Sequence, residues 1–226
     1  MIPDSSLKHK NCGRAVVSWT GGKDGCLALY KAILDGYKVS HLLNFRNTKK
    51  LGSHDISYDL LHAQSEAVGI PLICRDFVSY EDEFKKVVHS LVDSGTEINA
   101  AVFGHIETHG DLVERICRDL DIELYMPLWK QSSAGIINQI LEAGFEVILA
   151  SVKASLFSDE WLGRKIDVDF VKDLNDLDSS IDPCGESGEF HTLVTDGPIF
   201  KERIEIVGYD KVLRDGYWYL DVTETA

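Results

Sequence analysis

Residues 15–25 read Ala-Val-Val-Ser-Trp-Thr-Gly-Gly-Lys-Asp-Gly, and this stretch decides the fold. Its first part is short, apolar and β-branched, which predicts a buried strand that ends at the glycine pair. From Asp24 onward apolar residues recur at helical spacing as far as Leu34, and Gly36 follows as a C-terminal stop. The sequence therefore predicts a strand, a glycine-rich loop and a helix in immediate succession.

The same alternation of strand and helix continues to residue 153. The predicted strands after the first are 39–45, 72–75, 100–103, 123–125 and 146–152. The predicted helices between them are 57–68, 80–92, 112–120 and 133–143. Repeated βαβ units require a mostly parallel sheet, because a parallel connection needs a crossover. The expected fold class is α/β and Rossmann-like, with helices on both faces of the sheet.

After residue 153 the pattern changes, which predicts a second region. Short β-like runs are separated by turn residues. We expect them to form an antiparallel ribbon of 191–194, 200–207 and 217–222, with turns at Gly197-Pro198 and Asp215-Gly216. The predicted organisation is a nucleotide-binding domain at 1–153 and a smaller α+β region at 154–226 that binds the substrate.

The composition of the 226-residue chain argues against a nucleic-acid partner. Its 23 Lys and Arg residues are outnumbered by 37 Asp and Glu, and the net charge of −14 repels a phosphate backbone. The five cysteines form no C-x-x-C pair, which favours reduced thiols in the cytoplasm. No apolar run approaches the length of a membrane span or signal peptide. The oligomeric state stays open, with a homo-oligomer as one possibility.

The loop between the first strand and helix has the features of an anion site. Glycines allow close backbone approach, and free N–H groups at a helix start carry the positive end of its dipole. Lys23 adds a charge and Thr20 a hydroxyl. The loop is not an ordinary P-loop, because Val17 and Asp24 stand where that motif needs Gly and Ser or Thr. A glycine-rich turn without a ligand is the alternative.

A second cluster, Cys-Gly-Glu-Ser-Gly-Glu-Phe-His-Thr at 184–192, contains two carboxylates separated by a Ser-Gly turn. Flanking glycines allow Glu186 and Glu189 to point into one pocket. Such a pair can bind an amine, orient ammonia or help to hold Mg²⁺. An acidic surface turn is the alternative.

Two histidines follow the strand 100–103. On a helix, the four-residue spacing of His105 and His109 would present both side chains to a metal ion. Strand ends are also where α/β folds place ligands, so Gly104 and the histidines are alternatively expected to line the cleft. An uninvolved surface position is the third alternative.

The first loop closely resembles the S-G-G-K-D-S loop of the PP-loop ATP pyrophosphatases, whose members release the β and γ phosphates together as pyrophosphate. Both motifs together resemble the diphthine–ammonia ligase family, which carries C-G-E-G-G-E-[FY]-E-T followed by a P-[LI]-F turn. Here Pro-Ile-Phe stands at 198–200, and residues 64–72 are similar to the family's Q-A-E-A-x-G-I-P-L. The chain departs from the pattern at Gly25, Ser187 and His191, where the family has Ser, Gly and an acid.

This resemblance implies an enzyme that completes diphthamide on translation elongation factor 2, using ATP, Mg²⁺ and free ammonium. The substrate carboxylate would attack the α-phosphate, and ammonia would then displace AMP. The implied catalytic residues are Lys23, Asp24, Glu186 and Glu189, with Asp24 also orienting Mg²⁺.

The expected binding residues follow from the two motifs and from the neighbouring strand ends. Those expected to bind ATP are Ser18, Thr20, Gly21, Gly22, Lys23, Asp24, Gly25, Asn44, Phe45 and Gly104. Those expected to bind the acceptor are Gly185, Glu186, Ser187, Gly188, Glu189 and His191. For Asn44 and Phe45 an ordinary strand exit is the alternative.

Two other functions stay open. One is a different PP-loop enzyme, such as a tRNA thiolase or lysidine-type ligase, which would need a basic docking surface. The other is a sensor that holds ATP without turning it over, since Gly25 lacks the hydroxyl of the family's Ser.

Overall fold

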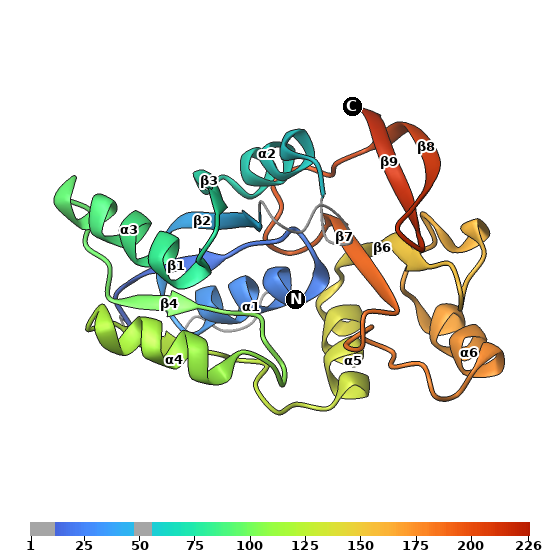
Figure 1. The fold of residues 1–226 in the computed structure, drawn as a ribbon, viewed down its shortest axis with the longest axis horizontal. Coiled ribbons are helices and arrows are strands. Elements are labelled where there is room, and N and C mark those ends of the chain that lie inside the picture. Colours follow the sequence, from blue (N-terminus) through green and yellow to red (C-terminus); the bar gives the residue numbers. More distant parts are fainter. Residues whose placement is uncertain (1–11, 48–55) are drawn as a thin grey trace, which may run out of the picture.

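The structure, a computed structural model, describes residues 12–47 and 56–226 of the chain. These residues form two sheets that lie side by side (Figure 1). The first sheet is parallel throughout, with strand order β3-β2-β1-β4-β5. Its strands are β1 (Arg14–Ser18), β2 (Lys38–Asn47), β3 (Leu72–Phe77), β4 (Ala100–Val102) and β5 (Glu123–Tyr125). The predicted α/β class is confirmed.

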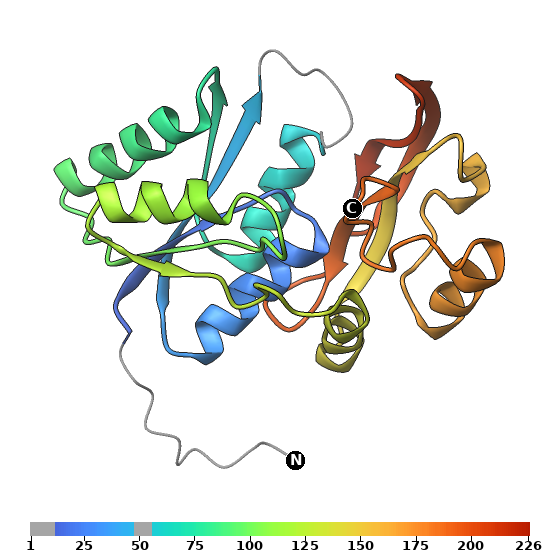
Figure 2. The same cartoon turned by 60° about the horizontal axis from the view of Figure 1, so that its bottom comes forward.

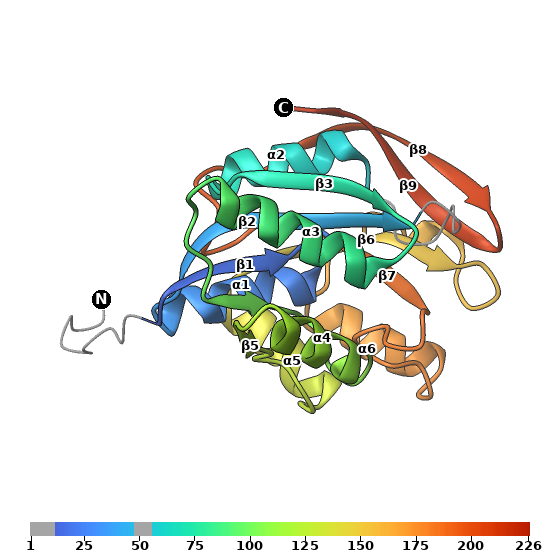
Figure 3. The ribbon, with the colours of Figure 1, turned by 60° about the vertical axis from the view of Figure 1, so that its left-hand side comes forward.

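Helices cover both faces of this sheet, as the sequence predicts. The helices that follow its strands are α1 (Lys23–Leu34), α2 (Tyr58–Val68), α3 (Tyr80–Asp93), α4 (Gly110–Asp119) and α5 (Ser133–Ala143). Successive strand residues point to opposite faces, so Val16 belongs to the apolar cluster that contains Phe84 of α3, while Val17 belongs to the cluster that contains Leu27 of α1. Figure 3 shows α3 and α4 on the near face of the sheet. No helix in the described part of the chain has the length and apolar character to cross a bilayer.

The second sheet is antiparallel and has strand order β7-β6-β9-β8. Its strands are β6 (Glu146–Lys153), β7 (Phe190–Asp196), β8 (Ile206–Arg214) and β9 (Tyr217–Thr225). Between β6 and β7 lie the short η1 helix (Asp159–Trp161) and α6 (Val168–Leu177). The predicted turn at Asp215-Gly216 joins β8 to β9, and both residues have positive φ, 49° and 81°. Such angles are those of a tight hairpin turn.

The sheet assignment of β6 corrects the sequence analysis. Residues 146–152 were expected to extend the parallel sheet, but they pair antiparallel with β7 and β9. The apolar run at 146–152 predicts a strand that is buried on both faces. Because such a strand fits a parallel or an antiparallel sheet equally well, the periodicity of the sequence does not identify its partner strands. The predicted ribbon is corrected in the same way, because β7 pairs with β6 and residues 200–205 are not a strand. The domain boundary at 153 stays a prediction, although the change of sheet comes earlier, between β5 and β6.

One apolar cluster joins the two sheets. It contains Ala15 and Val17 of β1 together with Leu149 of β6 and Phe190 and Leu193 of β7. Figure 2 shows α1 lying between the parallel sheet and the second sheet. The C-terminal end of β1 is therefore brought next to β7, and this junction positions the candidate site.

Candidate active site

The glycine-rich loop joins β1 to α1 and ends in a helix start aimed at β7. Gly22 is the N-cap of α1, and no side chain at this position caps the helix. The amide of Lys23 instead donates to the Thr192 hydroxyl of β7, at 3.1 Å. The first amides of a helix have no partner within the helix and carry the positive end of its dipole. The loop therefore has the geometry of the predicted anion site.

The Gln64 side chain of α2 holds this loop in place through hydrogen bonds. It is fully buried, and its amide donates to the carbonyl oxygens of Gly21 (2.9 Å) and Val194 (2.8 Å). Its carbonyl oxygen accepts from the indole of Trp19 at 3.2 Å. One side chain therefore ties together the residue after β1, the loop and β7. Gln64 lies in the segment 64–72 that is similar to the family pattern, but that pattern predicts no such role for it.

Gly21 needs to be glycine for two reasons. Its φ of 77° lies in the left-handed region, and an added Cβ would lie 2.5 Å from the Gln64 side-chain oxygen. A side chain at this position would thus strain the backbone and displace the clamp. The close approach of the loop to α2 depends on both residues together.

Lys23 and Asp24 form an ion pair at the mouth of α1. The Nζ–Oδ2 distance is 2.8 Å, and the lysine is 4% exposed. Burial would lower the pKa of Lys23, but Asp24, followed by smaller effects of Cys184 and Glu186, outweighs burial and raises it. The raised pKa favours the charged form of the lysine inside the site.

The donor set of Asp24 suits a hard cation. Its Oδ1 is buried, and no group in the described residues hydrogen-bonds to it. Mg²⁺ typically takes one or two protein carboxylates and completes its shell with water and substrate phosphates. No cluster of three or more His, Cys, Asp or Glu side chains suitable for a metal occurs in residues 12–47 and 56–226. Asp24 Oδ1 therefore fits a magnesium that arrives with a polyphosphate.

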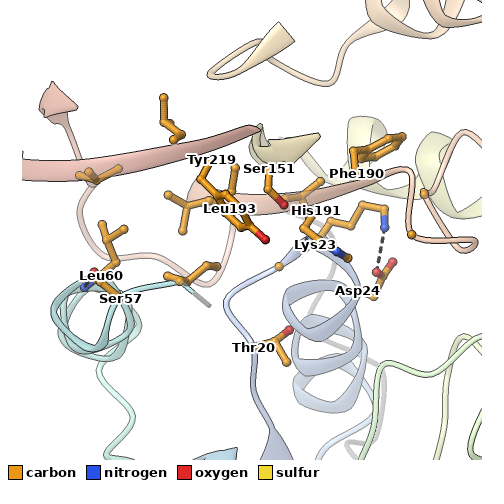
Figure 4. A pocket seen from close by; sticks show the side chains of 18 of the residues that line it. Thr20, Lys23, Asp24, Ser57, Leu60, Ser151, Phe190, His191, Leu193 and Tyr219 are labelled. Carbon is orange, nitrogen blue, oxygen red and sulfur yellow. Dashed lines mark hydrogen bonds and ion pairs between the residues drawn. The ribbon is translucent and has the colours of Figure 1, made fainter. Parts of the chain in front are cut away.

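A cavity of about 380 Å³ opens between this helix start and the second sheet. Figure 4 shows Lys23 and Asp24 at one side, Ser57 and Leu60 at the start of α2 at another, and His191, Leu193 and Tyr219 on the strands. The predicted residues that line it are Thr20, Gly22, Lys23, Asp24, Gly185, Glu186, Gly188 and His191. The structure thus brings both sequence motifs into one cavity. The two motifs are far apart in the chain, and Lys23 and Thr192, for example, are separated by 169 residues.

The two acids of the second motif occupy different positions. Glu186 lines the cavity, and desolvation together with the nearby Asp24 carboxylate raises its pKa to about 7, against the opposing effect of Lys23. Glu189 is buried, and its carboxylate accepts from the backbone amides of Ser187 (2.9 Å) and Asp182 (3.4 Å). Contrary to the prediction, the pair does not face one pocket. Glu186 faces the cavity, and Glu189 holds the loop that carries it.

Several residues expected to bind ATP lie behind the loop rather than in the cavity wall. The Asn44 amide donates to the Trp19 carbonyl at 2.8 Å, and the Ser18 hydroxyl lies 3.2 Å from that of Tyr80. Phe45 packs edge-on against Tyr80, with ring centroids 5.2 Å apart. These contacts support the shape of the loop, and direct binding of nucleotide by these residues stays a prediction.

Two glycines at this helix start differ in the space around them. An added Cβ at Gly104 would lie 2.7 Å from the Asp24 carbonyl, so this glycine allows the β4–α4 loop to pack on α1. At Gly25 the nearest atom would be the Ser18 carbonyl at 3.7 Å, an ordinary contact. The first departure from the family pattern is therefore not required by packing.

The histidine pair does not lie on a helix. His105 is in the loop after β4, and His109 precedes α4 with a φ of 65°. Their rings are 5.5 Å apart between centroids. The expectation that a helix would present both to a metal is wrong, because α4 begins only at Gly110.

Part of the cavity wall had no signal in the sequence. It comes from the β8–β9 hairpin and from the residues around the start of α2, and these missed positions are Ser57, Arg214, Tyr219 and Asp221. The hairpin turn itself is readable from Asp215-Gly216. Its position beside β6, which places Tyr219 opposite Ser151, depends on strand pairing across the fold.

Comparison with known proteins identifies the family of this chain. The family model of the diphthamide synthase N-terminal domain matches residues 13–124, and that of the C-terminal domain matches residues 132–225. The chain belongs to the diphthamide synthase family. The two matches meet in the segment where this diphthamide synthase chain passes from its first sheet to its second.

Curated relatives match most of this diphthamide synthase chain. A diphthine–ammonia ligase of Danio rerio is 24% identical, with 88% of this chain and 89% of the relative covered. A diphthine–ammonia ligase of Mus musculus is 23% identical, with 86% and 83% covered. A solved structure from Methanocaldococcus jannaschii, described as a predicted subunit of tRNA methyltransferase, has a TM-score of 0.43 and 17% identity, with 82% and 97% covered.

Proposed function

We propose that this chain is an ATP-dependent ligase that adenylates a carboxylate and transfers ammonia to it, releasing AMP and pyrophosphate. The observation that carries the proposal is the meeting of Lys23 and Glu186 in one cavity. The first is a buried cation at a helix start, and the second is a carboxyl group whose pKa is raised to about 7. The relatives named diphthine–ammonia ligase support diphthine as the acceptor. That this diphthine is carried by elongation factor 2 is what the family resemblance implies.

The phosphate loop would bind the β and γ phosphates of ATP. Backbone amides at the start of α1 and the ammonium group of Lys23 are donors for the oxygens of that tail. They stabilise charge that gathers on pyrophosphate as the bond to the α-phosphate breaks. Asp24 Oδ1 would hold Mg²⁺, which neutralises phosphate charge when it is bound.

Glu186 would receive ammonium and take a proton from it. A carboxyl group with a pKa of about 7 is ionised in a substantial fraction of molecules at neutral pH and accepts a proton readily. Loss of that proton makes the nitrogen a nucleophile for the acyl-adenylate. Glu189 then acts as a positioning residue, since its bonds to two loop amides hold the turn on which Glu186 stands.

The proposal also specifies the type of acceptor, the source of ammonium and the region that binds the acceptor. The acceptor is a protein in the cytoplasm, ammonium is taken from solution, and the second region carries the acceptor-binding residues. The excess of acidic residues supports a partner other than nucleic acid.

The products test the proposed reaction. The protein is incubated with Mg²⁺, ATP, ammonium and elongation factor 2 bearing diphthine, and the nucleotides are separated by chromatography. AMP and pyrophosphate are expected in equal amounts, and each turnover should convert one acceptor carboxylate to an amide, visible by mass spectrometry. ADP and phosphate as the products would exclude adenylation.

A cellular experiment tests the acceptor separately. Mass spectrometry of elongation factor 2 from cells that lack this protein should show diphthine accumulating. Intact diphthamide in those cells would remove this acceptor while leaving the adenylation chemistry to be judged by its products.

A further inference from the structure

The cavity contains a second cation, from the other sheet, that the phosphate site does not use. Arg214 ends β8 and lines the cavity. Its guanidinium lies 4.7 Å from the ring centroid of Tyr219. No carboxylate in residues 12–47 and 56–226 forms an ion pair with it, although Lys23, Arg164 and other basic residues do have such partners. In a chain of net charge −14 an arginine facing a cavity without a carboxylate partner has donors to offer a ligand.

Strand pairing places the Arg214 side chain beside Tyr219, although Arg214 is exposed. Arg214 pairs with Tyr217 in the hairpin register, and Val212 pairs with Tyr219, so Arg214 and Tyr219 share one face. Tyr219 is only 7% exposed, which makes its ring a firm platform for a stacked guanidinium. The amide of Ala154 donates to the Gly216 carbonyl at 2.8 Å and fastens the hairpin turn to β6.

We infer that Arg214 binds the carboxylate of the acceptor before it is adenylated. The guanidinium presents a planar fork that matches a carboxylate in two hydrogen bonds. In the proposed reaction the polyphosphate tail is bound by Lys23 and the helix amides, and ammonium is bound by Glu186. Of the two glutamates in the second motif, Glu186 is the one that lines the cavity in the described residues. The three charged groups of the reaction therefore have three separate protein partners. The inference rests on the proposed function.

Steady-state kinetics of four proteins test this assignment. They are the wild type, Arg214→Gln, Arg214→Lys and Lys211→Gln. Lys211 is the control, because it lies on the same strand, loses the same charge and does not line the cavity, its ion-pair partner being Asp159 at 3.5 Å. AMP formation is measured while ATP or diphthine-bearing elongation factor 2 is varied, and Mg-ATP binding is measured directly by calorimetry.

Arg214→Gln should raise the KM for the acceptor by about tenfold or more, because a charge-assisted bond is lost, while the KM for ATP stays within about twofold. Arg214→Lys should fall between it and the wild type, since it keeps the charge but not the fork. Lys211→Gln should match the wild type. Unchanged Mg-ATP binding and melting temperature show that the variants are folded.

Two results would overturn the assignment. A higher KM for ATP with the acceptor KM unchanged would place Arg214 on the nucleotide, and wild-type kinetics in Arg214→Gln would remove it from both substrates. If the wild type forms no AMP, the proposed function fails. The acceptor's dissociation constant for wild type and Arg214→Gln, measured by calorimetry without ATP, then still decides whether Arg214 binds it.

Discussion

The two walls of the cavity are built in different ways. The wall at the end of β1 is a single continuous turn, in which Thr20, Gly22, Lys23 and Asp24 are neighbours in the chain. The facing wall is assembled from β7, β9, the end of β8 and the loop at 184–188, which meet only through the pairing of the second sheet. The first wall offers backbone amides and a buried lysine, and the second offers side chains of several kinds. The part suited to a common phosphate tail is therefore local in the sequence, whereas the part suited to a particular acceptor is assembled from distant segments.

The largest effect is expected from removing the cation of the local wall. Lys23→Met should lower kcat/KM by about 100-fold or more, because the charge that balances the leaving pyrophosphate is lost. It also leaves the Asp24 carboxylate without its partner at 2.8 Å. Pyrophosphate release is the measurement, and Lys31→Met in the last turn of the same helix is the control. A loss below about fivefold would show that the polyphosphate lies elsewhere.

Glu186→Gln tests the chemistry of the facing wall. The ionised carboxylate is the active form, so wild-type activity should rise with pH through the raised pKa of about 7. The variant should lose about 100-fold in kcat/KM and this rising limb together. A pH profile of kcat/KM for ammonium is the measurement, because that parameter reports the ionisation of the free enzyme. An unchanged rising limb in the variant would assign the titration to another group.

Glu186→Gln is expected to lower activity but not stability at high pH. A carboxyl group whose pKa is raised in the folded state binds more protons folded than unfolded, so wild-type stability falls as pH rises from about 4.5 to about 7. Glu186→Gln removes this loss, and its melting temperature at pH 8 should equal or exceed that of the wild type. Thermal melting at pH 5 and pH 8 is the measurement.

Glu189→Gln is expected to show the reverse pattern. The carboxylate accepts from two backbone amides, and an amide side chain would set an N–H group against one of them. The loss of about 1–2 kcal/mol should lower the melting temperature by a few degrees. Activity should fall less than in Glu186→Gln, because the acid that faces the cavity is kept. If Glu189→Gln keeps wild-type stability and loses all activity, the division of roles between the two acids is wrong.

The smallest effect is expected at the departure from the family pattern in the local wall. Gly25→Ser places a Cβ no nearer than 3.7 Å to the surrounding atoms, so the fold should be unaffected. An added hydroxyl at the helix start would lower the KM for ATP by at most about tenfold, the worth of one hydrogen bond. Melting temperature and the KM for ATP are the measurements. A clear loss of stability would show that the turn is tighter than the structure indicates.

Much of the first region was predictable because its signals are local. The spacing of apolar residues gave β1 and α1, and the glycine pair with Lys23 gave the anion site at their junction. Strand and helix alternation was enough for the parallel sheet, since a βαβ unit has few ways to fold. The helix-face metal pair failed because α4 begins after His109, and helix boundaries are the least certain part of such a prediction.

The second region was predictable only in its pieces. The glutamates of the second motif and the Asp215-Gly216 turn are visible in the sequence, but the partner strands of β6 are not. The sequence also does not predict that Glu189 accepts a hydrogen bond from its own loop, or that Gln64 donates to both Gly21 and Val194. Such hydrogen bonds depend on the distances between groups in the folded chain.

The layered α/β scaffold, the phosphate loop and the two acids of the second motif can be read from the amino-acid chain alone. The folded structure is needed to show which acid faces the cavity, which residues support the loop, and that Arg214 and Tyr219 line the facing wall. The two kinds of information differ because they depend on interactions of different range. Backbone geometry and periodicity act over a few neighbouring residues, whereas burial, hydrogen bonding and pKa depend on groups that the fold alone brings together.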